Sequence, residues 1–292
     1  MTLGRLYLKA AATSVGPRAE KLPDTVLTRS KVEVDRAHLA GYARVCGFGF
    51  TDMLPLTYPH LLAFGLQVEL MAARSFPLPL PGLVHIANTI TAHRRIEASE
   101  PLEMRVHAER LIPHPKGAQV DLVGRIDAGG QEVWTGRSTY LARGARTPDA
   151  NPPTVNAVRH EDSATGPADT GRAATIGTDG PPVAVWRVDA GTGRRYASVS
   201  GDVNPIHLHP LTAKAFGFPR AIAHGMWTAA RALAALEGRI PDAARYDVTF
   251  GRPVLLPSTV ELRTREDSDG WHVDVRSGEH PHLSAVVRAN VS

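Results

Sequence analysis

The two halves of this sequence repeat one another. Residues 42–48 read Tyr-Ala-Arg-Val-Cys-Gly-Phe, and residues 196–202 read Tyr-Ala-Ser-Val-Ser-Gly-Asp at the equivalent place in the order of predicted elements. A repeated order of elements indicates two copies of one structural unit. The chain is therefore predicted to form two related domains.

Each copy is predicted to place an apolar helix before its strands. Ala63-Phe64-Gly65-Leu66 opens such a run in the first copy, and Ala223-His224-Gly225-Met226 opens one in the second. Apolar residues then recur at helical spacing, and Gly238 with Pro241 predicts the end of the second helix. Alanines in this run permit close packing, so we expect the helix to lie buried in a concave sheet.

Alternating polar and apolar residues predict an antiparallel meander after each helix. The expected strands are 102–112, 118–126 and 131–141 in the first copy, and 259–265, 271–276 and 283–291 in the second. Glu100-Pro101-Leu102 and Leu256-Pro257-Ser258 occupy matching places just before these sets. Segregated helices and antiparallel strands define the α+β class.

A Pro- and Gly-rich segment with few large apolar residues separates the copies. Such a composition is typical of a linker. We predict a first domain at 1–143, a linker at 144–182 and a second domain at 183–292. With 43% hydrophobic residues among 292, the chain is long enough for two apolar cores.

The chemistry-bearing motif is Gly201-Asp202-Val203-Asn204-Pro205-Ile206-His207. Gly201 permits a tight backbone path, and Pro205 pushes Asn204 away from the helical region, so that Asp202 and His207 can converge. A carboxylate and a neutral imidazole around one water can take and return a proton near neutral pH. The alternative is a polar turn with His207 idle on the surface.

The start of the second helix is a candidate oxyanion site. The N–H groups around Gly225 and Met226 have no partner within the helix and lie at the positive end of its dipole. Because Gly225 lacks a side chain, a substrate carbonyl can approach its N–H directly, as stabilisation of an enolate requires. The alternative is ordinary helix packing with Gly225 as a start signal.

The first copy lacks the acid/base residues. Phe48 stands where Asp202 stands in the second copy, and neither an Asn-Pro step nor a matching histidine follows. This half is predicted to be inactive and to accommodate an acyl chain in an apolar tunnel. Candidate lining residues, with plain core as the alternative, are Leu56, Leu61, Leu62, Phe64 and Phe76. His60 and His85 are expected to be hydrogen-bonded structural groups.

Residues 196–207, 223–225 and 250–257 resemble the MaoC-like, R-specific enoyl-thioester hydratases. The resemblance covers roughly residues 183–290 and implies a hot-dog fold, a long helix wrapped by an antiparallel sheet. Together with the duplication it implies a double hot-dog. Residues 58–64 and 82–85 are most similar to the actinobacterial (3R)-hydroxyacyl-thioester dehydratases.

This resemblance implies a hydro-lyase of fatty-acid or related lipid metabolism. Water is added reversibly across a trans-2-enoyl thioester to give the (3R)-3-hydroxyacyl thioester, with no cofactor. The substrate is carried on coenzyme A or on acyl carrier protein, and a homodimer is common in the family. Chain length, carrier, direction and the division of proton transfer stay open. The implied roles are catalysis by Asp202, His207 and Gly225, and loop support or substrate binding by Asn204, His224 and Met226.

Three alternatives stay open. Asp202 with His207, His209 and His224 has the residue types of a cation site for metal-dependent hydrolysis. The usual ligand spacing is missing, so no metal is predicted. A hot-dog thioesterase would hydrolyse the thioester, but the Asp-x-Asn-Pro-x-His order argues against it. A non-catalytic acyl-binding module is disfavoured because Asp202, His207 and Gly225 are all present.

Composition excludes several other classes. The single cysteine, Cys46, excludes an intramolecular disulfide, and no signal peptide is recognisable, which favours the cytoplasm. The apolar stretch 61–73 is too short to span a bilayer. A net charge of +4 without interleaved aromatics does not predict a nucleic-acid surface. Candidate contacts to carrier phosphates, with solvated surface as the alternative, are Arg194, Arg195, Arg220 and Arg252.

Overall fold

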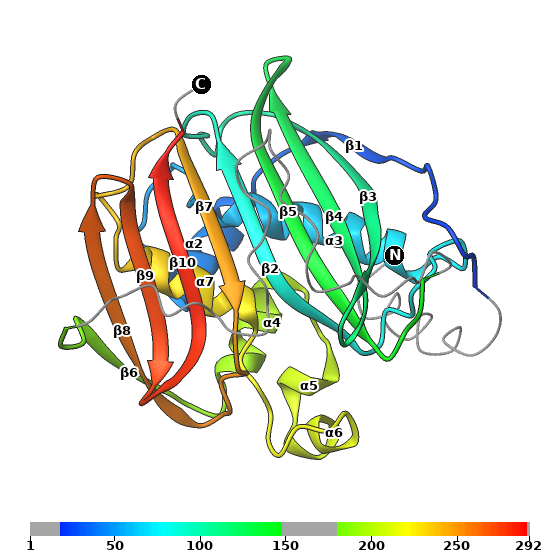
Figure 1. Ribbon diagram of the computed structural model, residues 1–292. Coiled ribbons are helices and arrows are strands. Elements are labelled where there is room, and N and C mark those ends of the chain that lie inside the picture. Colours follow the sequence, from blue (N-terminus) through cyan, green and yellow to red (C-terminus); the bar gives the residue numbers. More distant parts are fainter. Residues whose placement is uncertain (1–17, 148–179, 291–292) are drawn as a thin grey trace.

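A single curved antiparallel sheet runs across the molecule, and the longest helices lie against one of its faces (Figure 1). The computed structural model describes residues 18–147 and 180–290. The ten strands follow the order β1-β3-β4-β5-β2-β7-β10-β9-β8-β6. In the first half the strands are β1 (Leu27–Val32), β2 (Leu83–Ala92), β3 (Leu102–His114), β4 (Gly117–Ala128) and β5 (Gln131–Arg143). In the second half they are β6 (Ala184–Val188), β7 (Ala244–Phe250), β8 (Ser258–Asp267), β9 (Gly270–Ser277) and β10 (His280–Ala289).

The sheet order confirms the duplication, because it is the same when read from either edge. β1 corresponds to β6, β3 to β8, β4 to β9, β5 to β10 and β2 to β7. The two halves join where β2 pairs with β7 in antiparallel register, from Ala87 opposite Thr249 to Ala92 opposite Ala244. The six strands predicted from alternation are confirmed, whereas these two central strands and the short edge strands β1 and β6 were missed.

The repeated heptapeptide ends a helix in both halves. Helix α2 (Arg36–Cys46) stops at Gly47, with φ of 84°, and α4 (Thr192–Ser200) stops at Gly201, with φ of 70°. Both glycines adopt the left-handed conformation that a residue with a β-carbon rarely takes. The equivalent residues Tyr42 and Tyr196 meet, with ring centroids 6.5 Å apart. The two copies therefore face each other through α2 and α4.

Helices α3 (Tyr58–Ala72) and α7 (Gly225–Ala234) lie against one face of the sheet (Figure 1). The burial predicted for α7 is confirmed, since Ala229 and Ala230 are fully buried. Two predicted details are wrong. Helix α3 begins at Tyr58, favoured by Pro59 in its first turn, so Gly65 lies inside the helix. Helix α7 ends at Ala234, after which the backbone bonds change to the tighter i→i−3 pattern.

Residues between the two sets of strands are only partly described. β5 ends at Arg143 and β6 begins at Ala184, while most of the predicted linker falls on 148–179, outside the described residues. The domain boundaries and the homodimer stay predictions. Two short helices, α5 (Pro205–Leu208) and α6 (Pro210–Ala215), follow α4. Within 18–147 and 180–290, no helix has the length and apolarity needed to cross a membrane.

Candidate active site

The loop after α4 has the tight path that its sequence predicted. The backbone N–H of Asp202 donates to Ser200 Oγ at 3.1 Å, and that of Asn204 donates to Asp202 Oδ1 at 3.1 Å. Asn204 is extended, with φ of −55° and ψ of 123°, and its side chain accepts from the N–H of Ile206 at 3.4 Å. Asn204 therefore caps α5, which carries His207. The predicted convergence of residues 202 and 207 is thus produced by a cap and a short helix.

His207 has one nitrogen committed to the backbone. Its Nδ1 donates to the carbonyl of Ile222 at 2.9 Å, because a carbonyl can only accept. In the neutral ring this leaves Nε2 as a lone-pair acceptor. Burial lowers the pKa of His207, and the negative charge of Asp202 opposes that shift. The ring is thus a neutral base with a fixed tautomer near pH 7.

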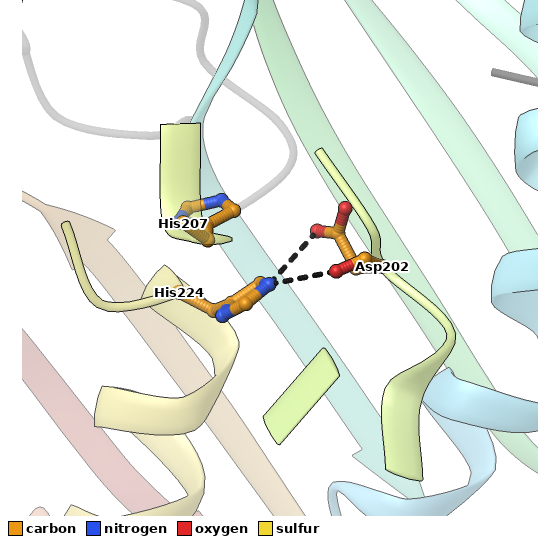
Figure 2. A group of neighbouring side chains, drawn as sticks. All are labelled: Asp202, His207 and His224. Carbon is orange, nitrogen blue, oxygen red and sulfur yellow. Dashed lines mark hydrogen bonds and ion pairs between the residues drawn. The ribbon is translucent and has the colours of Figure 1, made fainter. Parts of the chain in front are cut away.

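His224 holds the Asp202 loop from the opposite side. Its Nε2 donates to the backbone carbonyl of Asp202 at 3.0 Å and lies 3.8 Å from Oδ2 of the same residue, as Figure 2 shows. The His224 ring also stacks on His207 with centroids 3.6 Å apart. Burial lowers the pKa of His224 to about 3, so the contact with Asp202 is not an ion pair at neutral pH. The sequence suggested loop support or substrate binding, and this geometry is that of loop support.

The three side chains bring their polar atoms close together. One donor atom from each of Asp202, His207 and His224 lies within 4.8 Å of the others. A water bonded to a carboxylate oxygen and to the His207 Nε2 would span such a separation with ordinary hydrogen bonds. A cation would need a lone pair from His224 on the same side, and the Nε2 there is occupied by the bond to Asp202. The site geometry suits a bound water better than a metal.

These residues line a pocket to which both halves of the chain contribute. Gly225 and Met226 line it at the start of α7, and a β-carbon built on Gly225 would lie 3.0 Å from the Phe250 ring. Of the predicted tunnel residues, Leu61 and Phe64 line the pocket. Three do not: Leu56 and Leu62 pack against the core, and Phe76 is fully buried.

His60 and His85 line this pocket as well, which the sequence did not predict. His60 Nδ1 and His85 Nε2 are buried without a hydrogen-bond partner among the described residues. The expectation that both are hydrogen-bonded structural groups is therefore wrong at these two atoms.

The four candidate arginines separate into two kinds. Arg252 lines the pocket. Arg195 is paired with the exposed Asp189, while Arg194 and Arg220 donate to the backbone carbonyls of Leu208 and Pro257. His209 caps α6 through Nδ1, which accepts from Leu211, and it lies outside the cluster of Asp202, His207 and His224.

Gly193 is a site residue that the motif analysis missed. A β-carbon built there would lie 2.1 Å from the backbone oxygen of His207, so α4 and α5 approach more closely than any other residue permits. Comparison of the two copies could have revealed Gly193, because Leu39 occupies its place in the first half, which lacks the Asp-x-Asn-Pro-x-His motif.

We expect Gly193→Ala to displace His207. Overpacking of this kind costs about 1–3 kcal/mol of stability, and a shift of roughly 1 Å in a catalytic group lowers turnover by about 100-fold. Thermal unfolding and kcat measured together test this. Gly41→Ala is the control, since its added β-carbon would make only an ordinary contact of 3.6 Å with Val199. Unchanged kcat in Gly193→Ala would contradict the close approach.

The buried histidines predict a stability that falls with acid. Burial lowers the pKa of His60 to about 4 and lowers those of His85 and His224 to about 3. Below pH 6.5 the unfolded chain therefore binds protons that the folded chain does not, and stability is lost as the pH falls. Each histidine that stays neutral at pH 5 accounts for about 2 kcal/mol. Urea unfolding at pH 7 and pH 5 measures the difference, and His60→Leu is expected to reduce it. Equal free energies at both pH values would refute this.

Comparison with known proteins identifies the family. Residues 177–286 match the MaoC like domain. The chain is 38% identical to 3-hydroxyacyl-thioester dehydratase X of Mycobacterium tuberculosis over 287 residues, which cover 97% of this chain and 96% of that protein. The chain belongs to the MaoC-like dehydratase family. This confirms the resemblance noted in the sequence.

Solved structures confirm the fold of this MaoC-like dehydratase. The crystal structure of HtdX of M. tuberculosis superposes with a TM-score of 0.76 at 37% identity, covering 91% of this chain and 100% of that one. A MaoC-like dehydratase from Phytophthora capsici superposes with a TM-score of 0.69 at 18% identity over 94% and 97% of the two chains, which shows the fold alone. The predicted α+β double hot-dog fold is therefore confirmed.

Proposed function

We propose that this protein catalyses the reversible hydration of trans-2-enoyl thioesters to (3R)-3-hydroxyacyl thioesters, and the dehydration in the biosynthetic direction. The observation that carries the proposal is the spacing of Asp202 and His207 around a site for one water, beside the N–H of Gly225 in the same pocket. The full-length relative from M. tuberculosis bears the name of a 3-hydroxyacyl-thioester dehydratase.

The site residues divide the reaction between them. Asp202 and the His207 Nε2 bind the water and take one of its protons as the hydroxyl oxygen bonds to C3 of the enoyl chain. The electrons move to the thioester oxygen, where the N–H of Gly225 at the α7 N-terminus stabilises the enolate. A proton is then returned to C2. Water is thereby added in full, with hydroxyl at C3 and hydrogen at C2.

The proposal includes no cofactor, because the thioester itself activates the double bond and the enolate is stabilised by a backbone group. The substrate is an acyl thioester of coenzyme A or of acyl carrier protein. Arg143 and Arg252 line the pocket beside its apolar residues and can meet carrier phosphates.

The test is hydration of trans-2-enoyl-CoA substrates of short, medium and long chain. Loss of the enoyl chromophore should accompany formation of the R product, with no release of free thiol. Release of thiol without loss of the enoyl group would instead identify a thioesterase. Binding without either reaction would identify a non-catalytic acyl-binding module.

A further inference from the structure

The acyl side of the pocket carries a polar cluster contributed by the inactive half. On α3, His60, Phe64, Gln67 and Met71 are spaced to share one helix face, and all except Gln67 line the pocket. His85 faces them from β2, with its ring centroid 6.1 Å from that of His60. The function of the second half does not account for these polar side chains.

Tyr140 completes the cluster. Its ring stacks on His85 with centroids 4.6 Å apart, and its hydroxyl donates to Gln67 Oε1 at 3.4 Å. Three side-chain atoms here are buried and have no hydrogen-bond partner among the described residues, namely His60 Nδ1, Gln67 Nε2 and His85 Nε2. Buried polar atoms are nearly always satisfied, so three unsatisfied atoms in one cluster call for a ligand group or an internal water.

The two histidines of the cluster share a pocket with the acid/base residues. His85 contacts Phe250 with centroids 4.9 Å apart, and Phe250 in turn lies against Gly225. His60 and His85 line the same pocket as Asp202, so all three side chains face one cavity. Leu61, Leu80 and Leu83 add an apolar part to the same lining. An acyl chain held in this pocket therefore shares it with the two histidines.

The hydrogen-bonding character of the cluster is mixed. A backbone hydrogen bond at Ala87 raises the pKa of His85, so the ring is the donor in that bond, and the unpartnered Nε2 is left as an acceptor. Gln67 keeps a free amide donor, because its oxygen already accepts from Tyr140. Burial keeps both imidazoles neutral near pH 7 by lowering their pKa values.

We infer that the site takes acyl thioesters whose chain carries a hydroxyl group beyond the reacting carbons, and that His60 and His85 select it. This rests on the proposed function. A hydroxyl can donate to His85 Nε2 and accept from His60 Nδ1 in the tautomer that carries its proton there, which a plain alkyl chain cannot do. A ketone or a carboxylate only accepts and would leave Nε2 unpaired. Sites built to bond a substrate hydroxyl discriminate strongly against analogues that lack it.

The test compares trans-2-enoyl-CoA substrates bearing one hydroxyl at C5, C6 or C7 with unsubstituted chains of the same length. In the wild-type protein we expect the substrate hydroxylated at one of these positions to have a kcat/KM about tenfold or more above that of the unsubstituted substrate of the same length. His85→Phe and His60→Leu should bring the ratio of the two kcat/KM values close to one, mainly by lowering kcat/KM for the hydroxylated substrate. Leu83→Met is the control, because it alters the same lining without a polar group and should keep the ratio.

The outcomes separate the two proposals. Turnover of plain and hydroxylated chains with equal kcat/KM at every position would overturn the inference and leave the cluster as the site of an internal water, while the dehydratase function would stand. No turnover of any enoyl thioester would instead overturn the proposed function. The ratio of the two kcat/KM values in the wild-type protein tests the inference without any variant. Poor folding of His85→Phe would therefore not leave the inference untested.

Discussion

Replacing Asp202 by Asn is expected to lower kcat/KM for hydration by about 10²- to 10⁴-fold, the usual contribution of a positioned acid/base group. The change keeps the shape of the side chain and an oxygen that can still accept from the N–H of Asn204. It removes the negative charge and the capacity to take a proton. Hydration of a trans-2-enoyl-CoA followed by loss of the enoyl chromophore measures the effect.

Folding and substrate binding should survive this substitution. The control is Asp189→Asn, the same chemical change at an exposed carboxylate that pairs with Arg195 just before α4. Its activity should equal that of the wild-type protein, and both variants should bind a saturated acyl-CoA normally. Asp202→Asn with full turnover would exclude this carboxylate from the proton transfer.

His207→Ala should give a loss of the same order, because the water would lose the Nε2 acceptor. The double variant should be little worse than either single one, since residues that act as a unit are strongly non-additive. If the losses of the two single variants instead multiply in the double variant, the two side chains do not share one water.

Much of this fold was predictable because the determining signals are local. The repeated heptapeptide revealed the duplication, and six strands follow from alternation. Helices α2 and α4, which end at Gly47 and Gly201, were not predicted. β2 was missed because it is a central strand without clean alternation: His85 sits among apolar residues, and buried residues follow one another along the strand. β7 does alternate buried and half-buried residues, so its sequence carried a strand signal that was overlooked.

The site was predictable to the extent that it lies in one segment. Residues 202, 204 and 207 converge through a cap and a short helix that an Asn-Pro step encodes. The contacts of His224 and Gly193 join segments that are distant in the sequence or depend on how closely two backbones approach. The polar cluster of His60 and His85 depends on how α3 and β2 pack beside the second half, and single-residue patterns carry no signal for that.

Gly225→Ala is expected to lower kcat by about 100-fold, comparable to the loss of one oxyanion donor. The added β-carbon would lie 3.0 Å from the Phe250 ring, so the ring and the approaching thioester would both be displaced from the N–H. Because this N–H bonds the oxygen mainly as negative charge develops, kcat should fall more than KM rises. Steady-state kinetics of Gly225→Ala and Gly225→Val with one enoyl-CoA tests this, and the larger side chain should lower kcat further.

The control for this prediction comes from the other copy. Gly65 lies within α3, and a β-carbon there would meet no atom within 4 Å. Gly65→Ala should keep full activity and gain stability by roughly 1 kcal/mol from helix propensity. Gly225→Ala also gains helix propensity, so loss of activity without loss of stability would separate the oxyanion role from packing. Full activity in Gly225→Ala would place the oxyanion contact elsewhere in the pocket.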